Sequence, residues 1–306
     1  MTIAKLNTDS NYKILIAGAS GFVGGYLSKF LESHGFEIYK LVRRKPQNDF
    51  EIEWDPSKQF IDTNKLNNSK ISCVINLSGA SLSKNLRWTK NVKNEIYTSR
   101  INTTKFLSEI FKDKKLDLFI STSAIGIYGS QIEKAYENSS FDGDFLSKVC
   151  QDWEKSVVVN SQTRVVFTRF GIVMGNGGGI LKELTKTKFL KFLAILGNGK
   201  NKISWISLYD LSRAILFIIQ NEKIEGAVNL VNPYTITQEA LIKSLKNYYK
   251  CYFTVKIPKL FLYLIFGKEK TNVFLLSSQK VVPQKLLNFS FNWEDTKIED
   301  AIKRDF

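Results

Sequence analysis

The stretch that decides the fold is Ile14-Leu15-Ile16-Ala17-Gly18-Ala19-Ser20-Gly21-Phe22-Val23-Gly24. A short apolar run leads into three glycines at three-residue spacing, and an amphipathic segment follows. Gly18 permits a tight turn, Gly21 lets backbone N–H groups approach a pyrophosphate, and Gly24 allows a helix to pack closely on a strand. Strand, spacing and helix together favour a dinucleotide-binding loop over a plain strand–helix turn.

The next apolar run indicates which dinucleotide this loop would bind. The run ends as Leu41-Val42-Arg43-Arg44, without the Asp or Glu that commonly holds the ribose 2′-hydroxyl of NAD. A guanidinium at this point can make charge-assisted hydrogen bonds to a 2′-phosphate. We therefore expect NADP (NADPH) as the cofactor; the alternative is that both arginines are solvated surface residues.

Apolar runs and amphipathic segments alternate outward from this loop, as in a parallel sheet covered by helices. We expect an α/β protein: a Rossmann doubly wound parallel sheet with a smaller C-terminal α/β lobe. The NADP-binding domain should span 11–170 and the lobe 171–306, with some lobe segments returning to the first domain. The expected strands are Lys13–Ala17, Glu37–Val42, Cys73–Leu77, Leu116–Thr122, Arg164–Thr168 and Ala227–Leu230. The expected helices are Phe22–Ser33, with His34 inside it, Val92–Phe111, Phe145–Val159, Tyr209–Gln220 and Gln238–Tyr249.

Composition excludes several classes of protein. The three cysteines form no CxxC pair and His34 is the single histidine, so a disulfide framework or a transition-metal site is not expected. A reducing cytoplasm is the natural compartment. The longest apolar stretch, near Leu260 to Phe266, is too short to span a bilayer. We expect no metal and no membrane partner.

The formal net charge is +15, but the lysines that dominate it are scattered along the whole chain. A solvated lysine-rich surface is favoured over a nucleic-acid interface, because no nucleic-acid motif accompanies the charge. We expect a small-molecule substrate as the partner and no nucleic acid, and the oligomeric state is open. An anionic ligand would benefit from the positive field.

Several motifs resemble the extended short-chain dehydrogenase/reductases: Asn76–Ala80, Ser121–Gly129, Arg169–Gly175 and Ser204–Leu211. A second set is similar to the atypical, YfcH-like NAD-dependent epimerase/dehydratase branch of that family: Trp54–Pro56, Arg87–Thr89, Ser99–Ile101, Gly143–Leu146, Cys150–Glu154 and Val281–Leu286. The resemblance covers essentially the whole chain. It implies the Rossmann fold and a smaller C-terminal lobe, without a settled reaction.

The standard members of that family use Ser or Thr together with Tyr and Lys in a YxxxK pattern, which places both groups on one helical face. In the alignment on Trp153-Glu154, the tyrosine position falls on Leu146 and the lysine position on Cys150. Ser123 matches the family's serine. Ser121, two residues earlier, would lie on the same face of the strand and is the alternative match. Which residue takes the place of the missing tyrosine as general acid or base is an open question.

The candidate catalytic residues are Ser123, Arg100, Tyr128 and Cys150. Arg100 lies on a helical stripe with Ile96, Thr103 and Leu107, so its charge needs an acid, carbonyls or a bound anion, as a site residue or as a structural bridge. Tyr128 either replaces the missing acid or packs as an aromatic anchor. Cys150 either contacts the cofactor ribose or is a small buried hydrophobe, and a nucleophilic role is disfavoured.

The residues expected to bind the cofactor are Gly18, Ser20, Gly21, Phe22, Val23, Gly24, Arg43, Arg44, Leu77, Ser78 and Gly79. The turn Gly175–Gly179 is either a phosphate cradle or a plain loop, and Asp210 is a candidate helix cap. Together these features favour an NADP-dependent oxidoreductase or epimerase-like enzyme acting at a carbonyl or carbinol carbon. The alternative is a non-catalytic NADP-binding sensor or scaffold.

Overall fold

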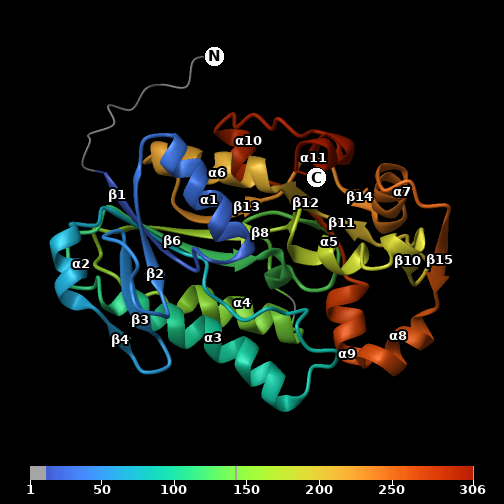
Figure 1. The fold of residues 1–306 in the computed structure, drawn as a ribbon, viewed down its shortest axis with the longest axis horizontal. Coiled ribbons are helices and arrows are strands. Elements are labelled where there is room, and N and C mark those ends of the chain that lie inside the picture. The colour runs from blue at the N-terminus through green and yellow to red at the C-terminus, as the bar shows by residue number, and fades with distance from the viewer. Residues whose placement is uncertain (1–11, 142, 306) are drawn as a thin grey trace.

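The computed structural model describes residues 12–141 and 143–305, and its centre is an eight-stranded sheet (Figure 1). Its strands are β1 (Lys13–Ala17), β2 (Glu37–Val42), β3 (Glu51–Asp55), β4 (Phe60–Ile61), β5 (Cys73–Asn76), β6 (Leu118–Ala124), β8 (Arg164–Phe170) and β13 (Gly226–Leu230). Their order is β13-β8-β6-β5-β1-β2-β3-β4. Every neighbouring pair is parallel except β3 and β4. This is the doubly wound Rossmann sheet that the sequence predicts.

Helices cover both faces of this sheet (Figure 1). One face carries α1 (Phe22–Ser33) and α6 (Leu208–Gln220); the other carries α2 (Thr63–Ser69), α3 (Lys90–Glu109) and α4 (Phe145–Lys155). Along β1, Ile14 and Ile16 join the core beneath α1 and α6, whereas Leu15 and Ala17 join the core of α2 and α3. Burial on both faces explains why the strands are continuous apolar runs.

Three element boundaries, those of β1, α1 and β2, coincide with the expected ones, and others differ for local reasons. Strand β6 begins at Leu118, where its pairing with β5 starts, and it extends to Ala124 because it pairs with β8 as far as Phe170. Helix α4 ends at Lys155, since the N–H and Oγ of Ser156 both donate to the carbonyl of Trp153. His34 lies just beyond α1 as its C-terminal cap.

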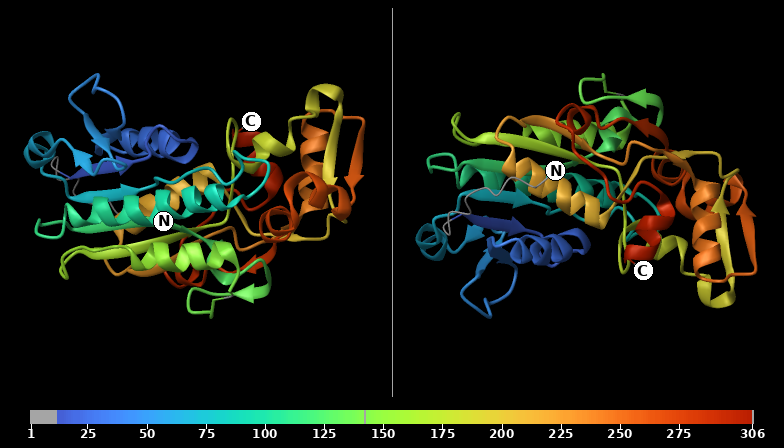
Figure 2. Two further views of the ribbon diagram at one scale, coloured as in Figure 1. Left: turned by 90° about the horizontal axis from the view of Figure 1, so that it is seen from below. Right: turned by 90° about the horizontal axis from the view of Figure 1, so that it is seen from above.

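The smaller lobe lies at one end of the sheet (Figure 2). Its paired strands are β9 (Ile172–Met174) with β12 (Trp205–Ser207), β10 (Phe192–Leu196) with β15 (Phe253–Ile257), β11 (Lys202–Ile203) with β14 (Ile236–Thr237), and β7 (Gln131–Ala135) with β16 (Ser278–Val281). Its helices are α5 (Gly179–Leu184), α7 (Gln238–Tyr248), α8 (Lys259–Phe266), α9 (Lys268–Lys270) and α11 (Ile298–Asp305). Helix α10 (Gln284–Asn288) instead returns to the large sheet, where its Leu286 joins the core beneath α1 and α6. Shorter turns are η1 (Ile125–Tyr128), η2 (Lys188–Leu190) and η3 (Thr271–Leu275). Within the described ranges, no helix is both long and apolar enough to cross a bilayer.

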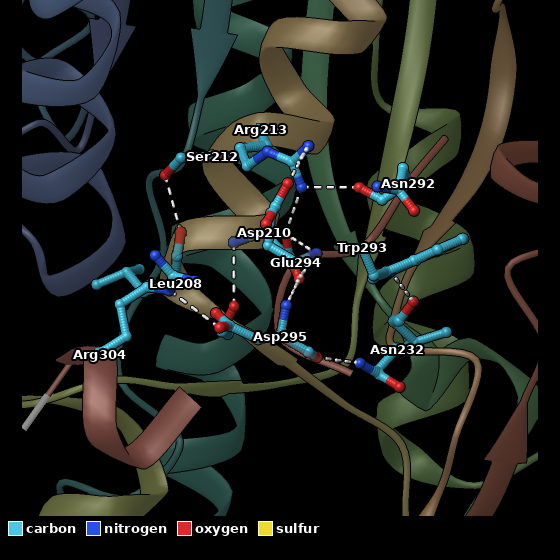
Figure 3. Close-up of polar contacts among 12 residues, drawn as sticks. Leu208, Asp210, Ser212, Arg213, Asn232, Asn292, Trp293, Glu294, Asp295 and Arg304 are labelled. Carbon is cyan, nitrogen blue, oxygen red and sulfur yellow. Dashed lines mark hydrogen bonds and ion pairs between the residues drawn. The ribbon is translucent and has the colours of Figure 1, made fainter. Parts of the chain in front are cut away.

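A buried carboxylate cluster fastens the C-terminal segment to α6 (Figure 3). Asp210 accepts hydrogen bonds from Nη1 of Arg213 at 2.8 Å and from the N–H of Asp295 at 2.9 Å. Asp295 accepts one from Nε of Arg304 at 2.9 Å. The expectation that Asp210 caps α6 is wrong: Ser207 is the cap, and its Oγ accepts from the N–H of Asp210.

Candidate functional site

The glycine loop joins the end of β1 to the start of α1. Gly18 has φ +82°, and a side chain there would bring a Cβ within 2.9 Å of the carbonyl oxygen of Leu77. A Cβ on Gly24 would lie 2.2 Å from the carbonyl oxygen of Gly18. Gly21 precedes α1 without a side-chain cap, and the first turn of α1 holds no acidic residue. The N–H groups of that turn are therefore free to receive an anion.

The second glycine-rich turn packs against this loop. A Cβ on Gly178 would lie 2.2 Å from Cγ of Phe22, and one on Gly175 would lie 3.1 Å from Cζ of the same ring. The glycines of Gly175–Gly179 thus make room for the Phe22 ring. This packing favours the interpretation of the turn as a loop over a phosphate cradle.

The two arginines at the end of β2 differ in their surroundings. Arg44 donates two hydrogen bonds of 2.7 Å each to the carboxylate of Glu51, which also accepts from the N–H of Gln47. The Arg44 guanidinium lowers the pKa of Glu51 to about 2. Arg43 is exposed and makes no ion pair or hydrogen bond with the described part of the chain. Of the two, only Arg43 has its full donor set available to a ligand.

A cavity of about 480 Å³ lies between the carboxyl ends of the strands and the smaller lobe. The large sheet with its helices and loops contributes Phe22, Val23, Gly79, Arg100, Ser123, Leu146, Cys150 and Trp153 to its lining. The lobe contributes Ile180, Ile203, Gln238, Leu241 and Val273, among others. Ligands of open α/β sheets bind at this edge. Size and place suit a small-molecule site.

Ser123 lies near the end of β6 and lines the cavity. It is 1% exposed, and its Oγ has no hydrogen-bond partner among the described residues. A buried hydroxyl without a partner is unfavourable unless a ligand or water completes it. Ser121 is equally buried and its Oγ also lacks a partner among the described residues, but Ser121 does not line the cavity. Position at the cavity, and not the missing partner, therefore distinguishes the two serines.

Arg100 brings a positive charge to the cavity from α3. Its Nη1 donates to the carbonyl of Ile96 and its Nη2 to that of Ala80, both at 3.0 Å, and its guanidinium lies 5.2 Å from the centre of the Trp153 ring. No carboxylate pairs with it among the described residues. Burial lowers the pKa of the guanidinium. Carbonyls hold the side chain, and its charge is not neutralised by the protein.

Gly79 makes room for Arg100. A Cβ at Gly79 would lie 3.3 Å from Cζ of Arg100. Gly79 belongs to the loop after β5, where the Oγ of Ser78 donates to Oδ1 of Asn76. The loop is fixed further by Asn76, whose Nδ2 donates to Oγ1 of Thr104 at 2.7 Å. This loop therefore borders both the glycine loop, through Leu77, and the cavity.

Leu146 and Cys150 of α4 line the cavity, and they are the two positions at which the family resemblance predicts Tyr and Lys. Burial raises the pKa of the Cys150 thiol to about 12, although Arg100 acts in the opposite direction. A thiol with such a pKa is protonated at neutral pH and is a poor nucleophile. Cys150 is placed to contact a ligand only as a small apolar group.

Tyr128 does not line the cavity. It is fully buried, its hydroxyl donates to Oδ1 of Asn229 at 2.7 Å, and Nη1 of Arg169 donates to that hydroxyl at 2.8 Å. Burial raises its pKa to about 12. The catalytic alternative for Tyr128 therefore has no geometric support, and the aromatic anchor describes its surroundings.

Sequence reasoning missed the lobe residues of the cavity, including Gln238, Asn201 and the η3 segment. It also missed Trp153 as the aromatic neighbour of Arg100. Helical periodicity predicts that Trp153 shares the apolar face of α4 with Leu146 and Cys150, but it carries no information on the contact with Arg100, which lies on α3. The lobe residues carry no comparable local signal, because contacts between distant segments place them.

The glycine loop, the doubly wound sheet and the cavity at its carboxyl edge define an extended short-chain dehydrogenase/reductase of the atypical kind. The model of the NAD dependent epimerase/dehydratase family matches residues 14–230, and a domain of unknown function, DUF1731, matches residues 257–304. The chain belongs to the NAD dependent epimerase/dehydratase family.

Relatives are similar along nearly the whole chain. The epimerase family protein ML0860 of Mycobacterium leprae is 30% identical over 292 residues, covering 94% of each chain. The epimerase family protein SAB0724c of Staphylococcus aureus is 34% identical over 301 residues, covering 95% of this chain and 99% of its own. Among solved structures, the human epimerase family protein SDR39U1 with NADPH superposes with a TM-score of 0.85 at 24% identity, covering 96% of this chain and 98% of its own.

Proposed function

We propose that the protein binds NADP(H) along the glycine loop and acts as an oxidoreductase or epimerase, in which NADPH would reduce a small carbonyl compound and NADP+ would oxidise a carbinol. The pyrophosphate would lie on the open N–H groups of the first turn of α1, where Gly21 leaves the approach clear. The 2′-phosphate would lie beside Arg43 at the end of β2. The solved human relative that contains NADPH supports this choice of cofactor.

Ser123 and Arg100 are the residues that would act on the substrate. When bound, NADPH would supply a hydride to the carbonyl carbon of the substrate. Ser123 would donate a hydrogen bond to the substrate oxygen, and Arg100 would stabilise the negative charge that develops there. Because Tyr128 lies outside the cavity lining, the proton would come from water hydrogen-bonded to Ser123.

The observation that supports this proposal most is the pairing of two incomplete polar groups in one apolar cavity. The Ser123 hydroxyl has no partner and the Arg100 guanidinium has no carboxylate. Each is costly in a folded protein unless a ligand completes it. A substrate oxygen or an anionic substituent would complete both. We place the protein in the cytoplasm, where its three free cysteines remain reduced.

The test follows NADPH oxidation with a panel of aldehydes, ketones and keto-sugars. We expect turnover with some member, and a loss of about tenfold or more in kcat/KM in Ser123→Ala and Arg100→Lys. Ser121→Ala is the matched control, since Ser121 is buried on the same strand outside the cavity lining. Equal losses in Ser121→Ala and Ser123→Ala would contradict the assignment.

A second function, an NADPH-binding sensor without turnover, is favoured by Leu146 and Cys150. Leu146 has no ionisable group and burial raises the pKa of the Cys150 thiol, so neither side chain reproduces the acid–base pair of Tyr and Lys, although both line the cavity. A sensor would bind NADPH with full affinity and oxidise it with no substrate. Unchanged NADPH affinity in Arg100→Ala, together with failure of every carbonyl compound, would support this function over the first.

A further inference from the structure

The outer face of the small sheet β10–β15 is an apolar surface that no described segment of the chain covers. Leu193 and Ile195 point inward to α7, so by alternation Phe192 and Ala194 point outward, whereas Leu196 at the end of the strand still packs against the core. The parallel register pairs Phe192 with Phe253 and Ala194 with Val255. The rings of Phe192 and Phe253 stack at 5.7 Å, and Phe253 is 53% exposed.

Helix α8 continues this surface, because only Pro258 separates it from β15. Leu262 is buried, whereas Leu260, Phe261, Leu264 and Ile265 are exposed by 67%, 57%, 63% and 47%. The sheet β10–β15 and α8 lie together at the end of the molecule farthest from α2 and β4 (Figures 1 and 2). We call the outer sheet face and these four α8 residues the lobe-end surface. Contiguous exposed apolar areas of this kind usually mark an interaction site.

The charges around the lobe-end surface are mostly positive, although Glu239 pairs with Lys256 of β15 at 3.1 Å and Glu269 follows Lys268. Segments 184–209 and 240–268, which carry it, contain no Asp or Glu and hold five and six lysines. Lys191 and Lys250 are exposed beside the start of β10 and β15, and Lys259 and Lys268 flank α8. Exposed aromatic residues, Phe189 and Tyr252, lie at the same strand ends. Apolar and aromatic side chains ringed by lysines suit the headgroup region of an anionic membrane.

We propose that the lobe-end surface binds peripherally to an anionic lipid bilayer. Lipid phosphates and carboxylates would neutralise the lysines while the apolar side chains enter the interface. A second copy of this chain fits less well, because a symmetric contact would bring like charges together. The expectation of no membrane partner rested on the length of the apolar runs, which bears on spanning a bilayer and not on lying upon it.

The test is co-sedimentation of the full chain with vesicles of phosphatidylcholine, alone or with about 30 mol% phosphatidylserine. We expect binding to the phosphatidylserine vesicles that weakens as salt is added. Phe261→Ser with Leu264→Ser should reduce it at least about tenfold. The matched control is Phe60→Ser, an exposed phenylalanine at the other end of the molecule, which should bind as the wild type does.

Lysine variants test the electrostatic part. Lys191→Gln with Lys250→Gln should lower binding by about fivefold for each charge removed. Lys112→Gln with Lys115→Gln, exposed at the end remote from the lobe, should leave it unchanged. All these side chains are exposed, and equal melting temperatures would confirm that the variants fold. Absence of binding to phosphatidylserine vesicles, or a solution dimer that Phe261→Ser with Leu264→Ser dissociates, would overturn the proposal.

Discussion

The guanidinium of Arg44 forms two hydrogen bonds, each 2.7 Å long, with the carboxylate of Glu51 on the neighbouring strand β3. This ion pair occupies the donors that Arg44 would otherwise offer to a ligand. Arg43, one residue earlier, has no such partner among the described residues. Arg44 is therefore engaged in an ion pair within the protein, whereas Arg43 is available to bind a ligand.

Substitution of each arginine should distinguish a role in cofactor binding from a role in stability. Arg43→Ala should weaken NADPH binding by about tenfold or more and leave NADH binding nearly unchanged, because only NADPH has the 2′-phosphate. Arg44→Ala should mainly lower stability, since it leaves Glu51 without its partner. Cofactor fluorescence titrations of both variants check this. A larger loss of NADPH preference in Arg44→Ala than in Arg43→Ala would show the assignment to be wrong.

Gly24 and Gly25 offer a matched pair within α1. Gly24→Ala should destabilise the protein by about 2 kcal/mol or more, because the new Cβ would meet the backbone oxygen of Gly18 at 2.2 Å. Gly25→Ala meets nothing closer than the carbonyl of Ala19 at 3.6 Å and should stabilise α1 by up to about 1 kcal/mol. Thermal unfolding of the two variants measures the difference. Similar melting temperatures would contradict the close helix–strand contact.

Asp210 should be the most sensitive acidic residue of the cluster in Figure 3. Asp210→Ala would leave Arg213 and the N–H groups of Glu294 and Asp295 without their acceptor, at a cost of about 3–5 kcal/mol. Glu294→Ala removes an exposed carboxylate 3.5 Å from the same arginine and should cost about 0.5 kcal/mol or less. Urea unfolding compares them, and a comparable loss in both would refute the central place of Asp210.

Cys150 should contribute to alkaline destabilisation. Burial raises the pKa of the thiol from 9.0 to about 12 in the folded protein. Above pH 9 the unfolded thiol ionises while the folded one stays protonated, so stability falls by about 1.4 kcal/mol per pH unit up to about pH 12. Cys150→Ala removes this contribution, and its deficit against the wild type should shrink between pH 9 and 12. A deficit that stays constant would argue against a buried thiol.

Local signals were sufficient for the first strand–helix–strand unit. The bounds of β1, α1 and β2 follow from the glycine spacing and from apolar runs, which act within a few residues. The predicted end of α4 at Val159 is wrong because the Ser156 side chain donates a hydrogen bond to the carbonyl of Trp153 and ends the helix there. Apolar periodicity gives no signal for such a hydrogen bond.

The sequence predicted which residues belong to the candidate site better than it predicted which residues contact one another. Ser123 and Arg100 stood out by motif and by helical stripe, and both line the cavity. The difference between Arg43 and Arg44 depends on Glu51, which β3 brings to the end of β2. The burial of Tyr128 depends on Asn229, a residue 101 positions further along the chain. Only the tertiary fold supplies such information.

The Phe22 ring has a mechanical consequence. It belongs to the glycine loop at the start of α1, yet it packs against Gly175, Gly178 and Gly179 of the turn that leads into the smaller lobe. The lobe cannot swing away to widen the cavity without drawing Gly178 off this ring, and the ring cannot shift without disturbing the loop. Opening of the cavity and order in the glycine loop are therefore coupled through the Phe22 side chain.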